Sequence, residues 1–227
     1  MSIIEFKNVS KLYTAGGNEH KALDNVSFTL EEAEMVVILG PSGVGKSTLL
    51  NLLGGLDSPS LGTIIVDGKD ISEYDDDELS EYRARKVGFV FQSYNLIPTL
   101  TVEENVELVN EIAPAALSTS EMLSEVGLSE HFKKFPTELS GGEQQRVAIA
   151  RSLITRPAII LADEPTGNLD RRNSEEIVSL FRLVNKRFMS TIMIITHDEK
   201  VANSCDKVYR MVDGKLNQME GIGYENH

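Results

Sequence analysis

The stretch MVVILGPSGVGKST, residues 35–48, decides the fold class of this chain of 227 residues. Its first five residues are all apolar and do not alternate with polar ones, so they predict a strand that is covered on both faces. The remaining GPSGVGKST, residues 40–48, is a glycine-rich turn, and a helix is expected to begin near Lys46. A buried strand that leads through such a turn into a helix is typical of an α/β fold with a mostly parallel sheet.

The same turn matches G-x-x-x-x-G-K-[ST], the pattern of a P-loop NTPase. Its glycines let the backbone wrap closely around phosphate groups, and the N-terminal end of the helix favours an anion. Lys46 is expected to reach the β- and γ-phosphates of ATP, and the hydroxyl of Ser47 to coordinate Mg²⁺. A turn of purely structural role is the alternative. The predicted phosphate-binding residues are Gly40, Pro41, Ser42, Gly43, Val44, Gly45, Lys46, Ser47 and Thr48.

The rest of the chain continues the α/β pattern after a β-rich start. The segments 3–13 and 21–30 partly alternate, and they predict two antiparallel strands joined by a long hairpin loop, TAGGNEH, at 14–20. Further apolar runs predict core strands, and periodic segments between them predict helices. The strands are expected at Val87–Phe91, Ala158–Ala162 and Thr191–Thr196, and the helices at Lys46–Leu56, Glu143–Ile154 and Ser174–Phe188.

The middle of the chain, residues 95–138, has a different character. It is polar and acidic, and it contains helical segments such as TVEENVELVNEI and no apolar run of the core type. We therefore predict a mainly helical subdomain inserted into a single domain, 1–227. The core and the antiparallel β-subdomain are then formed by 1–94 and 139–227.

Composition and charge narrow the classes of protein. The formal net charge of −13 argues against nucleic acid as a partner, and against broad binding to anionic lipid. No apolar run approaches the ~18 residues that span a bilayer, so direct membrane insertion is not expected. The start, MSIIEFKNVSK, does not resemble a signal peptide, which predicts a cytoplasmic protein. The single cysteine, Cys205, fits a reducing compartment, and we expect it to be a small buried or half-buried side chain and not a reactive one.

The stretch LADEPTGNLD, residues 161–170, places carboxylates directly after an apolar run. Asp163 is predicted to hold Mg²⁺, and Glu164 to position and polarise the water that attacks the γ-phosphate. An N-cap and turn pair is the structural alternative, because Pro165 and Gly167 mark a turn. Beside the phosphate-binding loop, the catalytic interpretation is favoured.

The segment LSGGEQQRVAIARSL, residues 139–153, resembles the signature motif of ABC ATPases. Ser140, Gly141 and Gly142 would open a helix and form a second anion site, with Gln144 in the same motif. An ordinary helix with this N-terminus is the alternative. The resemblance implies a head-to-tail dimer of two copies, in which each ATP lies between the P-loop of one copy and the signature of the other.

The resemblance extends to single residues. It implies that Gln92 touches Mg²⁺ and moves with the helical subdomain, and that His197 contacts the γ-phosphate. It also implies that 168–170 is the loop that reaches the partner copy, with Asp170 at the interface, and that Tyr13 stacks on adenine. Alternatives are a loop glutamine at Gln92, a satisfied polar histidine at His197 and a packed strand tyrosine at Tyr13.

Several longer stretches resemble the ABC ATPases that serve FtsX-like permeases in macrolide export, lipoprotein release and peptide-antibiotic resistance. They include LGGLDSPSLGTI, FQSYNLIPTLTVEENVEL and DEPTGNLD. Two departures stand out. Ala33 occupies a turn position where the family commonly has glycine, and the segment VNEIAPAALSTSEML makes the helical subdomain shorter than usual.

The resemblance therefore implies the ATP-binding subunit of an ABC transporter. It would hydrolyse ATP and drive a separate FtsX-like transmembrane permease for export or extraction of a drug, peptide or lipoprotein, from the inner face of the cell membrane. A cell-division-type ATPase that regulates an FtsX-like partner without transport is the main alternative. An ATPase acting on nucleic acid is disfavoured by the charge, and an importer is a weaker transporter alternative.

Overall fold

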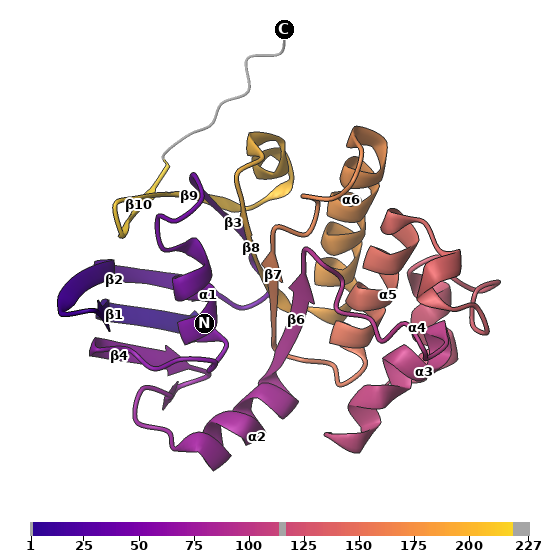
Figure 1. Ribbon diagram of the computed structural model, residues 1–227, viewed down its shortest axis with the longest axis horizontal. Helices are drawn as coiled ribbons and strands as arrows, with labels where there is room; N and C mark the ends of the chain where they lie inside the picture. The colour runs from indigo at the N-terminus through magenta and orange to yellow at the C-terminus, as the bar shows by residue number, and fades with distance from the viewer. Residues whose placement is uncertain (1, 114–116, 220–227) are drawn as a thin grey trace, which may run out of the picture.

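The computed structural model describes residues 2–113 and 117–219, and it contains two sheets (Figure 1). In the six-stranded sheet the central strands run parallel, and only the edge strand β10 is antiparallel. The strands lie in the order β10 (Lys215–Gln218), β9 (Lys207–Val212), β3 (Met35–Leu39), β8 (Thr191–Thr196), β7 (Ile159–Asp163) and β6 (Val87–Phe91). The predicted core strands are confirmed, and β7 ends one residue later than predicted, on Asp163.

Both faces of this sheet are covered, as the uninterrupted apolar runs predict. Along β3, Met35, Val37 and Leu39 pack into a core shared with α5 (Gly141–Leu153) and α6 (Arg171–Phe188). The alternate residues Val36 and Ile38 pack on the other side, with α1 (Lys46–Leu53) and the N-terminal sheet. Each fully buried side chain of this kind contributes about 1.5–3 kcal/mol, so the two cores hold the carboxyl ends of β3, β7 and β8 in fixed register.

The N-terminal sheet is antiparallel and has the order β2 (Asn18–Glu31), β1 (Ser2–Ala15), β4 (Leu61–Val66) and β5 (Lys69–Asp70). The predicted long loop at 14–20 is wrong, because the ladder continues through Tyr13 opposite His20 to Ala15 opposite Asn18. Gly16 and Gly17 alone make the turn, with φ of 59° and 83°. Two residues with positive φ match the twist of a tight hairpin, which glycine adopts without strain.

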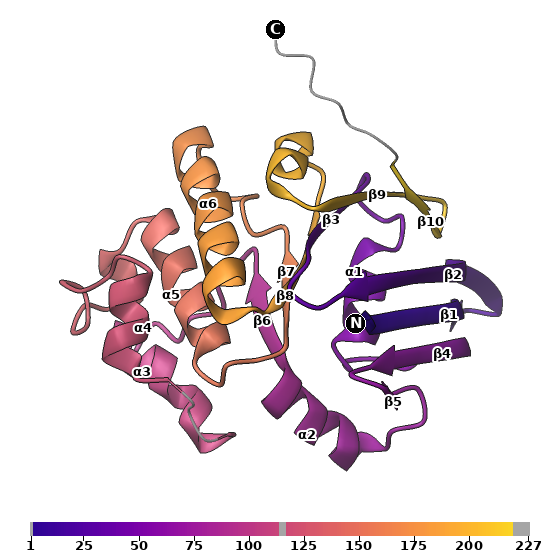
Figure 2. The same cartoon turned by 180° about the vertical axis from the view of Figure 1, so that it is seen from behind.

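The helical layer lies on the opposite side of the parallel sheet from the N-terminal sheet (Figure 2). Within it, α3 (Val102–Glu107) and α4 (Thr119–Glu125) pack on α5, and α5 packs on β6. Short 3-10 turns complete the segment, at Leu108–Glu111 and Pro136–Glu138. Residues 114–116, within the segment that looked shorter than usual, lie outside the described residues, and the boundary near 138 stays a prediction.

Helix ends follow local chemistry. The helix α1 ends at Leu53, before the predicted Leu56, with Gly54 as its C-cap. The helix α6 begins at Arg171, three residues before the predicted Ser174, because Asp170 caps it. The remaining helices are α2 (Asp76–Lys86) and the 3-10 turn Glu199–Ser204. No helix within 2–113 and 117–219 is long and apolar enough to cross a membrane.

Candidate functional site

The glycine-rich loop joins β3 to α1 and is shaped by its glycines. Gly45 has a φ of 109°, and a Cβ there would lie 2.3 Å from the carbonyl oxygen of Ala22, so no larger residue fits. The ammonium of Lys46 donates to the carbonyl oxygens of Gly40 and Pro41, at 2.7 Å and 2.9 Å. Lys46 is only 6% exposed, which means that the loop holds its cation in a preformed position at the base of the site.

A cavity of about 510 Å³ opens beside this loop. Its size lies within the range that is usual for sites of small ligands and cofactors. It brings together most of the residues that the sequence indicated for the nucleotide, from four separate parts of the chain. Those that line it are Tyr13, Ser42, Gly43, Gly45, Lys46, Ser47, Thr48, Gln92, Asp163 and Glu164.

Asp163 and Ser47 form the oxygen pair expected for a cation. Burial raises the pKa of the Asp163 carboxyl, the Ser47 hydroxyl bonded to it opposes that shift, and the neighbouring Glu164 adds to it. The described residues contain no group of three His, Cys, Asp or Glu side chains that could hold a metal by themselves. One carboxylate and one hydroxyl fit Mg²⁺, which in nucleotide sites takes few protein ligands and completes its shell with phosphate oxygens and water.

Glu164 follows directly, at the start of the turn after β7. Its φ is 45°, a left-handed conformation that costs a non-glycine residue about 1 kcal/mol. Its Oε2 accepts a hydrogen bond from the Thr196 hydroxyl at 2.9 Å and lies 3.0 Å from Nδ1 of His197, and its Oε1 lies 3.8 Å from Nζ of Lys46. The carboxylate is thereby aimed by residues at the end of β8. The sequence did not single out Thr196, although a threonine beside a strand-end histidine was the available signal.

His197 itself does not line the cavity around the P-loop. It contacts Glu164 and lines a different cavity, together with Thr166, Leu169 and Lys200. The histidine is therefore placed to act on Glu164 in this conformation, and its contact with a γ-phosphate stays a prediction.

Gln92 follows β6 and is tied to the loop after β7. Its Nε2 donates to Oδ1 of Asn168 at 3.1 Å, and Nδ2 of Asn168 donates back to the Gln92 carbonyl at 3.0 Å. A Cβ on Gly167 would lie 2.7 Å from the same Nε2, so the two loops touch closely. The amide nitrogen is thus used within the chain, and coordination of Mg²⁺ by Gln92 stays a prediction.

The residues after Gln92 are fixed to α5. The guanidinium of Arg151 donates to the carbonyl oxygens of Asn95 and Tyr94, at 2.6 Å and 2.8 Å. Both acceptor residues have positive φ, 61° for Tyr94 and 51° for Asn95, so the chain turns sharply around the arginine. The backbone after Gln92 is consequently attached to α5 by two hydrogen bonds.

The signature residues lie at the N-terminus of α5, outside the P-loop cavity. Ser140 is the N-cap, and Gln144 donates to the Leu139 carbonyl at 3.2 Å. A Cβ on Gly141 would lie 2.8 Å from the Tyr94 hydroxyl, and one on Gly142 would lie 2.8 Å from Oδ1 of Asn173. Both glycines therefore allow close packing against their own chain. The two predicted anion sites do not share one cavity.

Tyr13 and Asp170 have clear local roles. The Tyr13 hydroxyl donates to Asp57 at 2.8 Å, and the ammonium of Lys11 lies 5.1 Å from the ring centre. These two contacts hold the Tyr13 ring, which is 39% exposed, where it lines the cavity. Asp170 caps α6 by accepting from the backbone N–H and the side-chain amide of Asn173, at 2.9 Å and 2.7 Å. Its contact with a partner copy stays a prediction.

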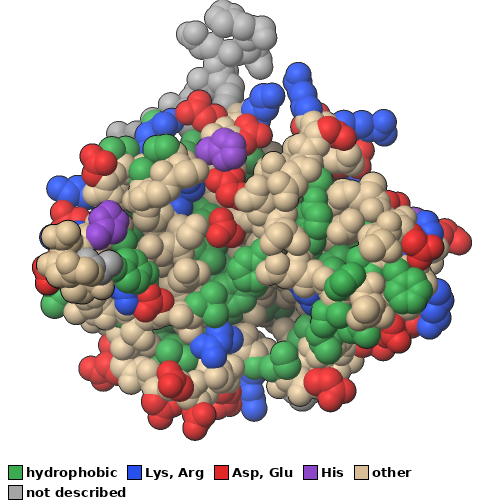
Figure 3. All heavy atoms as spheres, viewed as in Figure 1, with side chains coloured by type: hydrophobic (Ala, Val, Ile, Leu, Met, Phe, Trp, Pro, Cys, Tyr) green, Lys and Arg blue, Asp and Glu red, His purple; other side chains and the backbone are tan. Residues whose placement is uncertain are grey.

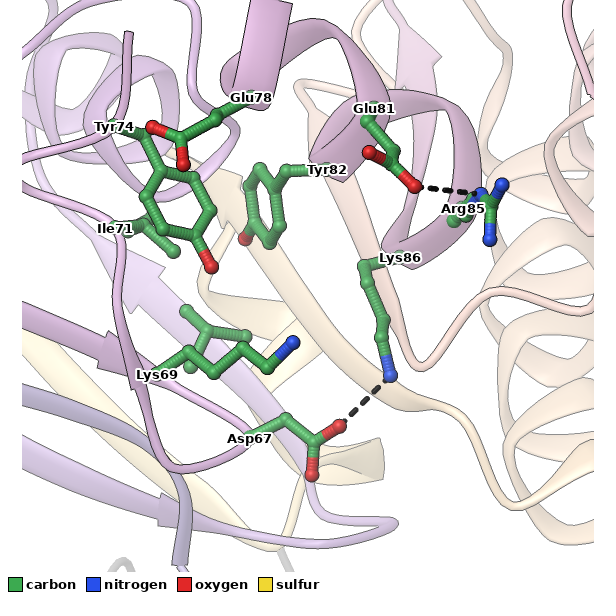
Figure 4. A pocket seen from close by; sticks show the side chains of 10 residues that line it. Asp67, Lys69, Ile71, Tyr74, Glu78, Glu81, Tyr82, Arg85 and Lys86 are labelled. Carbon is green, nitrogen blue, oxygen red and sulfur yellow. Dashed lines mark hydrogen bonds and ion pairs between the residues drawn. The ribbon is translucent and has the colours of Figure 1, made fainter.

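A second cavity, of about 350 Å³, lies between β5 and α2 (Figure 4). Tyr74 and Tyr82 line it, and its rim carries ion pairs between Lys86 and Asp67 at 2.7 Å and between Arg85 and Glu81 at 3.3 Å. It contains none of the predicted nucleotide-binding residues, and the pair between Lys86 and Asp67 links α2 to the turn between β4 and β5.

The family model for ABC transporters matches residues 23–167, a segment that begins in β2 and ends in the turn after Asp163 and Glu164. This chain belongs to the ABC transporter ATP-binding family, and it is an ATPase of that type. The mixed fold described above, with an antiparallel sheet, a parallel sheet and a helical layer, is the fold of these cassettes.

Three relatives show how far the similarity extends. The lipoprotein-releasing system ATP-binding protein LolD of Colwellia psychrerythraea is 40% identical, over 94% of this chain and 85% of LolD. The macrolide export ATP-binding/permease protein MacB of Hyphomonas neptunium is 44% identical, over 94% of this chain and 34% of MacB. A solved structure is also similar: the dimeric, post-hydrolysis state of the ATP-binding cassette MJ0796, bound to ADP and Pi. Its TM-score is 0.85 and its sequence is 41% identical, and the match covers 96% of this chain and 100% of the MJ0796 chain.

Proposed function

We propose that this subunit hydrolyses ATP in a head-to-tail dimer and thereby drives a separate FtsX-like permease, for export or extraction of a drug, peptide or lipoprotein. One observation carries the proposal. Lys46, Ser47, Asp163 and Glu164 share a cavity, whereas the second anion-binding helix end, at Ser140, lies outside it. Two copies facing each other would complete the site. The dimer of MJ0796 supports this arrangement, and the names of LolD and MacB support export or extraction.

Hydrolysis would use the carboxylate of Glu164 to orient the attacking water and draw its proton. The hydrogen bond from Thr196 and the contact with His197 hold the carboxylate just beyond the end of β7, where it would face the γ-phosphate. Lys46 would move from its carbonyl partners to the β- and γ-phosphates. Ser47, Asp163 and Gln92 would hold Mg²⁺, whose positive charge would offset the charge of the phosphates. Electrostatic positioning of this kind supplies most of the catalysis in phosphoryl transfer.

Coupling to the permease would run through the helical subdomain, residues 95–138. The segment after Gln92 is exposed at Ile97, which is 37% exposed, and Arg151 ties this segment to the signature helix. On the face in Figure 3, Lys and Arg side chains are scattered and do not gather into one patch, which fits docking to a protein better than to lipid or nucleic acid. The subunit would sit at the inner face of the membrane through its permease.

The first test is the mass in solution of Glu164→Gln, with and without ATP and Mg²⁺. This variant should bind ATP but not hydrolyse it, so ATP should convert a monomer into a dimer. The matched control is Glu164→Gln with Lys46→Ala, which should stay monomeric because ATP is not held. A Glu164→Gln protein that binds ATP and remains a monomer at all concentrations would rule out the proposed two-copy site.

The permease is tested separately. Basal ATP hydrolysis should rise several-fold when the subunit is reconstituted with an FtsX-like permease encoded beside it. Ile97→Glu should reduce that stimulation and leave basal hydrolysis unchanged. No stimulation by such a permease would contradict the assigned partner while leaving the ATPase activity in place.

A further inference from the structure

The signature serine is bound by a carboxylate of its own helix. Glu143, in the first turn of α5, accepts hydrogen bonds through Oε2 from the backbone N–H of Ser140 at 2.7 Å and from its hydroxyl at 2.6 Å. This capping box stabilises the helix end. It also occupies both donors that Ser140 could offer to an anion.

A carboxylate at this position opposes the proposed role of the helix end. A γ-phosphate of the partner copy would need the Ser140 hydroxyl, and it would approach a unit negative charge in the first turn of the same helix. The hydrogen bonds from Ser140 hold the pKa of Glu143 below its usual value, so the carboxylate is charged at neutral pH. Removal of that charge should therefore favour the phosphate.

His131 contacts the same carboxylate from the loop between α4 and α5. Its Nε2 lies 3.0 Å from Oε1 of Glu143, and because a carboxylate can only accept, the imidazole must donate. The other ring nitrogen, Nδ1, is buried and has no hydrogen-bond partner within 2–113 and 117–219. The imidazole therefore makes its only hydrogen bond within the described residues to Glu143. That hydrogen bond stabilises the carboxylate charge that lies beside the helix end.

We propose that Glu143 is an internal competitor for the phosphate-binding donors of Ser140, and that His131 is a positioning residue that weakens this competition by holding the carboxylate. The inference rests on the proposed two-copy site, which it deepens. Nucleotide from the partner copy would displace the Ser140 hydroxyl from Oε2, while His131 keeps Oε1.

The test is a double-mutant cycle in the Glu164→Gln protein, with the ATP-dependent monomer–dimer constant as the readout. Glu143→Gln, which keeps an acceptor for the cap but removes the charge, should tighten pairing by about tenfold, or about 1.4 kcal/mol. His131→Ala should weaken pairing three- to fivefold when Glu143 is present. In the Glu143→Gln protein it should change pairing by less than twofold, and His131→Gln, which keeps an N–H donor, should restore pairing.

Thermal unfolding of each variant separates this role from a structural one. If Glu143 and His131 only stabilise the helix end, their substitution should lower the melting temperature without tightening pairing, and the effects of the two should not depend on each other. Unchanged or weaker pairing of Glu143→Gln would overturn the inference. Failure of the parent Glu164→Gln protein to pair would instead overturn the proposed function and this inference with it.

Discussion

The ring nitrogen Nδ1 of His197 lies 3.0 Å from Oε2 of Glu164, across the ends of two neighbouring parallel strands. The same oxygen accepts from the Thr196 hydroxyl at 2.9 Å, and the backbone N–H of His197 lies 3.4 Å away. The carboxylate that we propose as the base is thus positioned by the end of a neighbouring strand, although Glu164 itself has an unfavourable φ of 45°.

Removal of the threonine hydroxyl should expose this dependence. Thr196 is 1% exposed, so Thr196→Val keeps its volume and removes one donor to Glu164. We expect kcat for ATP hydrolysis to fall about tenfold and KM to change less than about twofold, because positioning of the base is lost and binding is not. His197→Ala should lower kcat by about a hundredfold. The exposed strand variant Thr29→Val is the control, and a KM effect larger than the kcat effect would contradict this role.

Close packing at the signature helix predicts a steric effect. Because a Cβ on Gly142 would lie 2.8 Å from Oδ1 of Asn173, Gly142→Ala must displace a side chain that Asp170 already holds. Such overpacking costs about 1–3 kcal/mol of unfolding free energy, which urea denaturation measures. Adding Asn173→Ala should recover part of that loss. Additive effects of the two substitutions would show that the contact is not the cause.

The sequence predicted those parts of the structure that depend only on residues close together in the chain. The strand at 35–39, the loop to Lys46 and the helix behind it follow from neighbouring residues alone. The pairing of Glu164 with His197 does not, because it depends on β8 lying beside β7, and parallel strands that are far apart in the chain carry no local signal for their order. The tight hairpin at Gly16 and Gly17 was missed because the first residues of β2, 18–21, are polar and exposed on both faces, so period-two alternation begins only after the strand does.

Acid should weaken the partly exposed ion pair between Arg182 and Asp206. Hydrogen bonds from Arg182, at 2.6 Å and 2.8 Å, hold the pKa of Asp206 below its usual value, and the Met35 N–H adds to this against the effect of burial. Because the folded pKa is the lower one, the stabilisation is present above the unfolded pKa and is lost as pH falls through the folded value.

Asp206→Asn should therefore cost about 1–2 kcal/mol of unfolding free energy at pH 7, a modest figure because the side chain is 40% exposed. The difference from the parent protein should shrink as the pH is lowered from about 5 to about 2. Urea denaturation across this range is the measurement, with the exposed Glu73→Gln as control. A difference that stays constant with pH would show that the charge is not its source.

The single thiol should be unreactive in the folded protein. Burial raises the pKa of Cys205 to about 12, and its Sγ donates to the Val201 carbonyl at 3.4 Å. At pH 8 the thiolate is then rare, so labelling by a disulfide reagent should be at least about a hundredfold slower than for an exposed thiol. Labelling in urea should be fast. Rapid labelling of the native protein would mean that the segment around Cys205 opens readily.

Ala33, at the turn where the family commonly has glycine, should lower the free energy of unfolding measurably. Ala33 has a φ of 60°, a conformation that costs an alanine about 1–2 kcal/mol more than a glycine. Ala33→Gly should therefore raise unfolding free energy by about 0.5–1 kcal/mol after the entropy of the unfolded glycine is subtracted, or a few degrees in Tm. Gly68→Ala, at a φ of 72° with no atom within 4 Å of the new Cβ, makes the reciprocal test and should lose stability. A lower Tm for Ala33→Gly would contradict the strain.

The two hydrogen bonds from Arg151 to the carbonyl oxygens of Tyr94 and Asn95 bear on how such a subunit can change partners during evolution. The acceptors are backbone carbonyls, which every sequence provides. Exposed side chains that follow these two residues, such as Ile97, can therefore vary while the backbone remains hydrogen-bonded to the signature helix. A new docking specificity could arise by drift in that segment without rebuilding the connection to the ATPase site, as long as one arginine on a distant helix is inherited unchanged.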